Sequence, residues 1–199
     1  MGASSPEDYG DYFAWGETIK KSEYSYSTYK YRTPQGINKY TTNTNSVSIV
    51  DNKTELDVLD DAAYINWGDG WRMPSIIQMK ELLDNNYTTS EWISQNGIYG
   101  RKITSKLTGE NIFLPASGVI EGNSAISGIT GNYWSRSLDV TEPSFAQLLC
   151  FNSESIEASF LDFRYYGQTI RPVVNNSTII TSISLSSSLY PALSDNLKV

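Results

Sequence analysis

The segments GNYWSRS (residues 131–137) and YGQTIRPV (residues 166–173) bound the part of the chain that decides its fold. Between them, short runs rich in β-branched and aromatic residues alternate with polar turns, a pattern that predicts consecutive strands. We expect these strands at 133–137, 145–151, 156–160 and 169–173. Their apolar residues must share one core, whereas several charged and aromatic residues of the connecting loops have no place in it. The pattern favours a rigid β scaffold that presents a variable polar and aromatic surface.

The range 145–151, FAQLLCF, is almost continuous in apolar residues. Such a strand is typical of a central position in a sheet with both faces covered. Cys150 belongs to this strand, and free cysteines are among the most buried side chains. We therefore interpret Cys150 as a small apolar residue of the core.

The composition is that of a globular chain. Of 199 residues, 19% are charged and 13% are aromatic, and tyrosine leads the aromatic residues with 14 copies. A chain of this length favours one domain and can bury about 70% of the surface of its unfolded state. It therefore needs no disulfide or metal to build a core.

The charge argues against polyanionic partners. Lys and Arg total 15 against 22 Asp and Glu, which gives a formal charge of −7 and leaves no basic stripe for phosphate groups. We therefore expect neither nucleic acid nor an anionic membrane surface as a partner. No apolar run reaches about 18 residues, so membrane insertion is not expected either.

Missing residue types exclude further chemistry. The chain has a single cysteine and no histidine. It can form no internal disulfide and no CxxC pair, and it lacks the histidine of Ser-His or Cys-His catalysis and of histidine-bound zinc. We expect no catalytic residue, no cofactor and no metal.

Two short helices are predicted ahead of the closing strands. Asp60 or Asp61 can cap a helix that ends at Gly68. Ser75 and Gln78 form a capping-box pattern, and apolar residues at 76, 79, 82 and 83 indicate a helix of about ten residues that packs on the sheet.

The rest of the chain is expected to consist of strands and loops. Further strands are predicted at 92–94, 99–104 and 111–115, separated by Asn-Gly and Thr-Gly turns. The range 116–132, rich in Gly and Ser, and the range 22–45, rich in Tyr, Ser and Thr, are expected to be surface loops.

The chain changes in character after Val174. Residues 179–185 alternate between two faces and predict one more strand. We therefore divide the chain into a domain at 1–174 and a tail at 175–199, which is either a strand of its own or the start of a following domain.

Several short phrases coincide in order along residues 2–174. They are GASSPEDYGDYFAWGE (2–17), DDAA (60–63), WG (67–68), WRMP (71–74), ELL (81–83), IFLPASG (112–118), YWS (133–135), RYYG (164–167) and IRPV (170–173). Together they resemble the Fibrobacter succinogenes major paralogous domain, a family of bacterial surface modules similar to the C-type lectin fold.

The resemblance implies an α+β fold with a twisted antiparallel sheet, two helices and long loops. It implies a place on secreted proteins or lipoproteins at the cell surface, although residues 1–6 lack the layout of a signal peptide. Related C-type-lectin-like proteins diversified by retroelements vary their ligand-contacting residues in the segment that here runs from 134 to 171. Their function is binding.

Two departures from the family stand out. Members usually begin with a strand ahead of the Gly-Ala-Ser phrase, and its absence here predicts an unpaired sheet edge that the strand at 179–185 could fill, within the chain or in a neighbour. The sugar-calcium motifs Glu-Pro-Asn and Trp-Asn-Asp are also missing, so the fold alone does not imply sugar binding.

Several residues in the matching phrases are expected to be structural. A guanidinium has five donors, so the arginines that flank the closing turn can hold loop carbonyls or pair with a buried acid such as Asp60 or Asp61. The tryptophans of these phrases are expected in the core. The structural residues are Trp15, Trp67, Trp71, Trp134, Arg164 and Arg171.

Asp57, Asp60 and Asp61 offer three carboxylates close together in the sequence. With loop carbonyls they could hold a calcium ion, but their spacing is not that of an EF-hand loop. Helix capping explains one or two of them without a metal.

The ligand-binding residues are expected in the loops and strand ends of the closing segment. Aromatic and Arg side chains dominate contact energies in binding surfaces. The candidates are Arg136, Asn152, Glu154, Phe160, Asp162, Phe163 and Tyr165. Either Phe160 or Phe163 could instead belong to the core.

Three functions compete. The leading hypothesis is a non-catalytic, extracellular, adhesin-like module that binds a glycan or a protein. The second is an assembly subunit whose tail strand pairs with a neighbour to form a homo-oligomer. The third is a hydrolase of carbohydrates, with a carboxylate pair from Glu121, Glu154, Glu157 and Asp162; a formylglycine-generating oxidase is disfavoured because it needs two cysteines.

Overall fold

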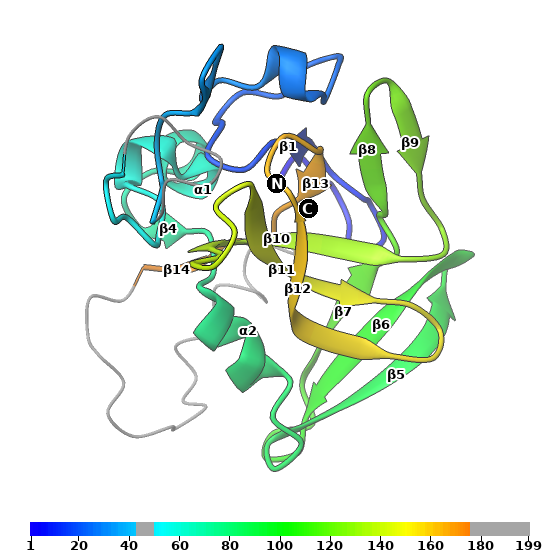
Figure 1. Ribbon diagram of the computed structural model, residues 1–199. Coiled ribbons are helices and arrows are strands. Elements are labelled where there is room, and N and C mark those ends of the chain that lie inside the picture. Colours follow the sequence, from blue (N-terminus) through cyan, green and yellow to red (C-terminus); the bar gives the residue numbers. More distant parts are fainter. Residues whose placement is uncertain (43–49, 176–199) are drawn as a thin grey trace.

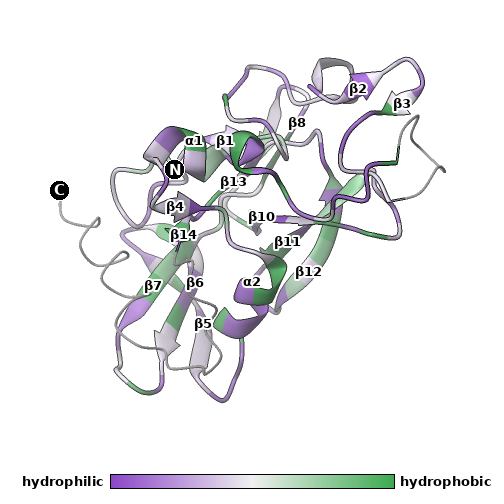
Figure 2. Ribbon diagram, turned by 90° about the vertical axis from the view of Figure 1, so that its left-hand side faces the viewer, coloured by the Kyte–Doolittle hydropathy of each residue, from purple (hydrophilic) through white to green (hydrophobic). Residues whose placement is uncertain are grey.

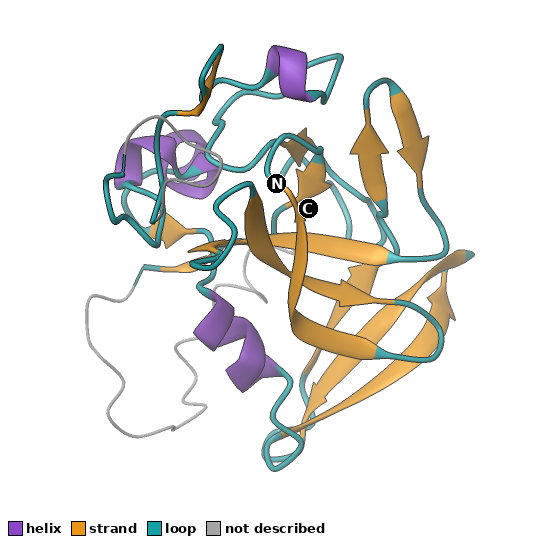
Figure 3. Cartoon of the chain, viewed as in Figure 1, coloured by secondary structure: helices purple, strands orange, loops and turns teal. Residues whose placement is uncertain are grey.

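The computed structural model describes residues 1–42 and 50–175, and the predicted strand at 179–185 lies outside this part of the chain. Strands and loops make up most of it, and the two α-helices are short (Figure 3). The fold is α+β, as predicted.

A five-stranded sheet lies at the centre of the molecule (Figure 1). Its strand order is β1-β13-β10-β11-β12, and all neighbours are antiparallel except β10 and β13. The strands are β1 (Tyr12–Phe13), β10 (Gly131–Leu138), β11 (Phe145–Phe151), β12 (Ile156–Phe163) and β13 (Gln168–Thr169). The four closing strands are therefore confirmed, but the last is split, because Val173 belongs to another pair.

A three-stranded antiparallel sheet, β5-β6-β7, lies beside the first. Its strands are β5 (Thr88–Gln95), β6 (Ile98–Ser105) and β7 (Asn111–Pro115). These strands cover the predicted ranges and extend two of them.

Three strand pairs complete the fold. They are β2 (Arg32–Thr33) with β3 (Gly36–Ile37), β4 (Trp71–Arg72) with β14 (Val173–Val174), and β8 (Val119–Glu121) with β9 (Ser124–Ile126). The prediction of loops over 116–132 was therefore wrong in part, because this range forms the hairpin β8–β9. The hairpin is held by isolated bridges to Tyr24 and Gly167, residues far away in the sequence.

Both helices begin where the capping residues predict. Asp61 accepts hydrogen bonds from two backbone N–H groups at the start of α1 (Ala62–Trp67), which ends at Gly68 with a positive φ of 92°. In α2 (Ile76–Leu82), Ser75 and Gln78 form the reciprocal capping box. The helix is shorter than predicted because Leu83 has already left the helical conformation.

The central sheet is buried on both faces. Adjacent strand residues point to opposite faces, and Leu148 and Leu149 of β11 belong to two different apolar clusters. One cluster includes Trp15 and Trp134, whose indole N–H groups donate to Ser135 O and Phe13 O at 2.8 and 2.9 Å. The other includes the apolar stripe of α2, visible as green segments in Figure 2.

Cys150 departs from the prediction. It is only partly buried, although β11 is an interior strand with both faces covered. Its pKa rises to about 11 because of burial, with Glu157 and Asp162 adding negative charge nearby. The thiol therefore stays mostly protonated near neutral pH, the form that is the weaker nucleophile.

The tyrosine-rich segment is not a surface excursion in its described part. It contains the 3-10 helix η1 (Tyr26–Thr28) and β2–β3, and it folds back over the central sheet (Figure 1). Tyr24, Tyr29, Tyr31 and Tyr40 are buried in the same cluster as Trp15. The prediction of a surface loop was wrong because these four side chains are part of the hydrophobic core.

Candidate functional site

Five aromatic rings form a continuous, partly exposed group where β11, β12 and η1 meet. We call Tyr26, Phe145, Phe163, Tyr165 and Tyr166 the aromatic cluster. Ring centroids lie 4.5 Å apart for Phe145 and Phe163, 5.0 Å for Phe163 and Tyr165, 5.0 Å for Tyr165 and Tyr166, and 5.7 Å for Tyr26 and Tyr165. Tyr26 is 38% exposed and the other four are partly buried. Such a group is of the kind that dominates contact energies in binding surfaces.

Local structure explains how the rings meet. Phe145 and Phe163 are directly opposite in the β11–β12 ladder, so their side chains share one face. The chain then turns at 164–167, which brings Tyr165 and Tyr166 back toward Phe163. Tyr26 comes from η1, where the Ser25 and Thr28 side chains close a capping box.

A fully buried arginine holds the turn in place. Arg164 has no exposed surface, and its guanidinium donates to Tyr29 Oη at 2.9 Å and to the carbonyls of Lys39, Tyr40 and Pro143 at 3.0 to 3.2 Å. It also lies 4.7 Å from the centroid of the Trp15 ring. Of the two predicted kinds of partner, Arg164 contacts loop carbonyls, and rings as well, rather than Asp60 or Asp61.

Two carboxylates border the aromatic cluster. Tyr166 Oη donates to Glu121 Oε1 at 2.6 Å, and Gln168 Nε2 donates to Asp162 Oδ2 at 2.7 Å. The pKa of Asp162 rises to about 6, mainly because of burial and also because of the negative charge of Glu121, although hydrogen bonds from the Phe163 N–H and from Gln168 act in the opposite direction. Asp162 is thus an acid that titrates near the physiological range.

Gln168, which contacts Asp162, is fully buried. It has no exposed surface, and its side-chain oxygen lacks a hydrogen-bond partner among the described residues. Because both atoms belong to one planar amide, this oxygen lies beside the nitrogen that contacts Asp162. A buried acceptor without a donor costs free energy.

The structure gathers some predicted ligand-binding residues and separates others. Asp162, Phe163 and Tyr165 lie together, and Phe160 is 46% exposed on the same strand, β12. Neither Phe160 nor Phe163 is fully buried, so the alternative of a core residue is wrong for both. Glu154 is exposed at the far end of the strand, in the turn before β12.

Arg136 and Asn152 are engaged within the protein. Arg136 forms an ion pair with Glu55 at 2.8 Å and donates to Met73 O at 2.9 Å. Asn152 Oδ1 accepts the N–H groups of Glu154 and Ser155 at 2.8 and 2.9 Å and so shapes the turn between β11 and β12. Both side chains therefore stabilise the fold through internal contacts, which were not predicted from the sequence.

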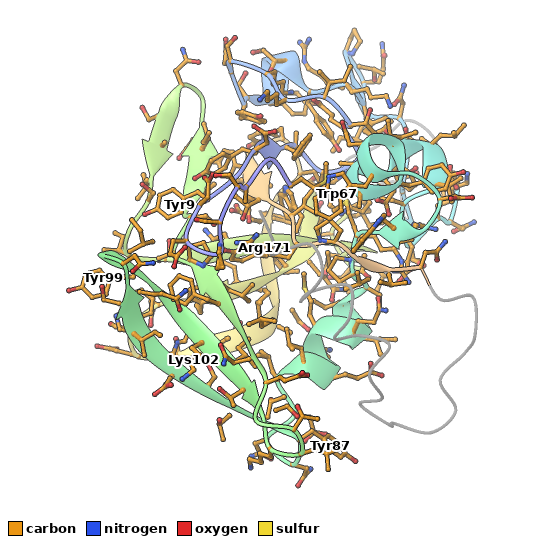
Figure 4. All side chains as sticks on the ribbon, turned by 180° about the vertical axis from the view of Figure 1, so that it is seen from behind. Tyr9, Trp67, Tyr87, Tyr99, Lys102 and Arg171 are labelled. Carbon is orange, nitrogen blue, oxygen red and sulfur yellow. The ribbon has the colours of Figure 1, made fainter. Side chains whose placement is uncertain are left out.

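The tryptophan predictions need one correction. Trp15 and Trp134 are fully buried, but Trp67 is 44% exposed at the end of α1 (Figure 4). It contacts the partly buried Trp71 edge to face, with centroids 5.0 Å apart. Trp67 was wrongly placed in the core because α1 is too short to bring its last residue over the sheet.

Arg171 is held by the N-terminal segment, near Tyr9 (Figure 4). Its guanidinium donates to Pro6 O at 3.3 Å and lies 3.5 Å from Asp8 O. It therefore ties the loop at 6–8 to the closing segment, which agrees with a structural role.

The three clustered aspartates all have protein partners. Asp57 and Asp60 form ion pairs with Lys39, and Asp61 pairs with Arg72 at 2.8 Å and caps α1. Over residues 1–42 and 50–175, no group of three His, Cys, Asp or Glu residues could hold a metal ion. The aspartates are explained without calcium.

Three residues of the aromatic cluster were missed from the sequence, Tyr26, Phe145 and Tyr166, and Glu121 was named only as a candidate carboxylate of a hydrolase. RYYG at 164–167 marked Tyr166 as part of a matching phrase, and the ladder of two adjacent apolar strands could have paired Phe145 with Phe163. No local signal places Tyr26 or Glu121, because each reaches the site from a segment distant in the sequence.

The sequence matches no protein-family model, no curated protein and no solved structure. In the part of the chain that the structure describes, no helix is both long and apolar enough to cross a membrane.

Proposed function

We propose that this chain is a non-catalytic binding module of a bacterial surface protein, with a C-type-lectin-like fold, and that it binds a glycan or a protein through the aromatic cluster. The observation that supports this is the continuous group of partly exposed rings from two distant segments, Tyr26 and Tyr165. Rings on a rigid sheet lose little conformational entropy on binding, which favours recognition.

The scaffold beneath the cluster fits this role. Arg164 fixes the turn from below through four hydrogen bonds, so the rings of Tyr165 and Tyr166 are presented with little freedom. Preorganised side chains reduce the cost of binding, which is how a small surface reaches useful affinity.

A panel of immobilised glycans and bacterial surface proteins, probed with the wild type and with Tyr165→Ala, tests the proposal. We expect the variant to lose about tenfold or more in affinity for any ligand found. Tyr87→Ala is the control, because Tyr87 is a 36% exposed tyrosine that directly precedes β5 and lies outside the aromatic cluster (Figure 4). Equal binding by the wild type and Tyr165→Ala would move the site elsewhere.

A hydrolase of carbohydrates is the second candidate, favoured by the raised pKa of Asp162 next to Glu121. Release of reducing sugar from polysaccharides distinguishes the two. A hydrolase requires turnover that Asp162→Asn and Glu121→Gln each abolish, whereas a binding module gives none in any form.

A further inference from the structure

Glu121 and Asp162 lie beside the aromatic cluster and have no Lys or Arg ion pair among the described residues. Among the described residues, Lys or Arg ion pairs are made by Asp11, Glu17, Glu55, Asp57, Asp60, Asp61 and Glu91, but by neither acid at the cluster. Charge repulsion from Glu121 contributes to the raised pKa of Asp162. A positive charge placed between them would remove this repulsion.

The rings beside the acids also favour a cation. Aromatic faces carry negative electrostatic potential and attract ammonium and guanidinium groups. The protein already uses this contact at the rim of the cluster, where the Arg32 guanidinium lies 5.6 Å from the centroid of the Tyr26 ring. Tyr165 and Tyr166, nearer to the acids, have no Lys or Arg over their rings in the described chain.

Gln168 supplies the third, independent observation. Its amide is fully buried. The amide nitrogen donates to Asp162, and the amide oxygen has no hydrogen-bond partner among the described residues. The buried surroundings of Asp162 are therefore rich in acceptor oxygen, which favours a donor-rich group beside this acid. Three kinds of feature, the acids, the rings and this oxygen, all call for the same ligand chemistry, a group rich in N–H donors and positive charge.

We propose that the aromatic cluster, together with Glu121 and Asp162, binds lysine or arginine side chains of a partner protein. This inference rests on the proposed binding function and names its ligand. A neutral sugar would leave both carboxylates without a cationic partner, and a bare metal ion would gain little from the rings. The formal charge of −7 also steers a basic partner toward this chain at long range.

Titration calorimetry of the whole chain with hexalysine at low salt tests the inference. We expect binding that the double variant Glu121→Gln/Asp162→Asn weakens about tenfold or more, because two charge-assisted contacts are lost. Glu81→Gln/Glu110→Gln is the control, since it removes the same charge from two exposed positions on α2 and the β6–β7 turn and should bind like the wild type. Hexalysine binding that is equal in all three forms, or absent, overturns the inference.

Thermal unfolding of each variant shows whether it is folded. If the double variant fails to fold, Glu121→Gln alone takes its place, because Glu121 is exposed and its amide can still accept from Tyr166. A loss of at least about threefold is then expected for hexalysine. An unchanged affinity counts against the inference.

Further ligands distinguish this inference from the wider proposal. Hexaglutamate should not bind, and an oligomer of glucosamine should bind more weakly than hexalysine. Tighter binding of the glucosamine oligomer overturns the choice of a protein partner. Binding of a neutral oligosaccharide that depends on Tyr165, without hexalysine binding, overturns the cationic ligand but leaves the binding function intact. If no ligand depends on Tyr165, both fail.

Discussion

Arg164 shows how a single residue can fix a surface from below. Its guanidinium is fully buried and has no carboxylate among its hydrogen-bond partners in the described chain. Three loop carbonyls, one tyrosine hydroxyl and the faces of Trp15 and Tyr29 surround it instead. A planar guanidinium can satisfy all of them at once, which a point charge cannot.

Arg164→Lys should therefore destabilise the protein, although the charge is kept. We expect a loss of about 2 to 4 kcal/mol in the free energy of unfolding, because several buried acceptors lose their donors. Chemical denaturation measures it. Arg32→Lys, at an exposed arginine, should change the same quantity by no more than about 0.5 kcal/mol. Similar small effects in both variants would refute this account of Arg164.

Among the elements, β10 and β11 depend on a close approach of backbone and ring. An added Cβ at Gly131 would lie 2.0 Å from Phe151 Cζ, well inside any allowed contact. Gly131 and Phe151 are opposite each other in the ladder, so the ring of Phe151 covers the glycine. Phe151 then fills the cluster shared with α2.

Gly131→Ala should separate these two strands at their end. We expect a loss of about 1 to 3 kcal/mol in the free energy of unfolding, because the buried ring must move. Gly70→Ala is the control, since nothing lies within 4 Å of a Cβ added there. A Gly131→Ala protein as stable as the control would show that Phe151 can shift at no cost.

β12 is the exposed edge of the central sheet, and its own irregularity protects it. Ser159 has a positive φ of 88°, where the ladder with β11 shifts register between Leu148 and Leu149. A bulge of this kind, with charged residues such as Glu157 on the strand, discourages pairing with another chain. The exposed side chains of β12 are thus available to a ligand, while its backbone is poorly suited to pair with a strand of another chain.

At the scale of the whole molecule, the buried acid Asp60 joins the tyrosine-rich segment to the part of the chain that leads into α1. Asp60 is 5% exposed and accepts from Lys30 Nζ at 2.8 Å and from Lys39 Nζ and Tyr40 Oη at 2.5 Å. Burial alone would raise the pKa of Asp60, but these hydrogen bonds outweigh it and hold the pKa far below its usual range.

The sign of this shift predicts acid sensitivity. A carboxyl group whose pKa is lower in the folded state stabilises the fold above its unfolded pKa and loses this effect as the pH falls. The free energy of unfolding should therefore drop as the pH decreases below about 4. Asp60→Asn should cost about 3 kcal/mol at pH 7 and less at low pH, so that the two curves converge.

Denaturation at several pH values checks this, with Asp69→Asn as the control at an exposed aspartate. The control should follow the wild type throughout. Parallel curves for the wild type and Asp60→Asn would mean that the carboxylate does not hold the tyrosine-rich segment.

Features that depend on near neighbours along the chain could be predicted from the amino-acid sequence. Asp61, Gly68, Ser75 and Gln78 act within one turn of the helices that they cap, so α1 and α2 were predictable. The strands at 133–137, 145–151 and 156–160 followed from short apolar runs bounded by polar turns, and the lack of histidine and of a second cysteine excluded whole classes of catalysis. These conclusions need no knowledge of which segments meet.

The burial and the contacts of side chains from segments distant along the chain became known from the folded molecule alone. Tyr29 meets Arg164 across 135 positions, which turns a polar-looking segment into core. Tyr26 and Glu121 reach the closing turn in the same way, while Arg136 and Asn152 are drawn into internal bonds. A tyrosine or arginine is amphipathic, so its local sequence suits either core or surface, and only the neighbours that folding brings to it select one.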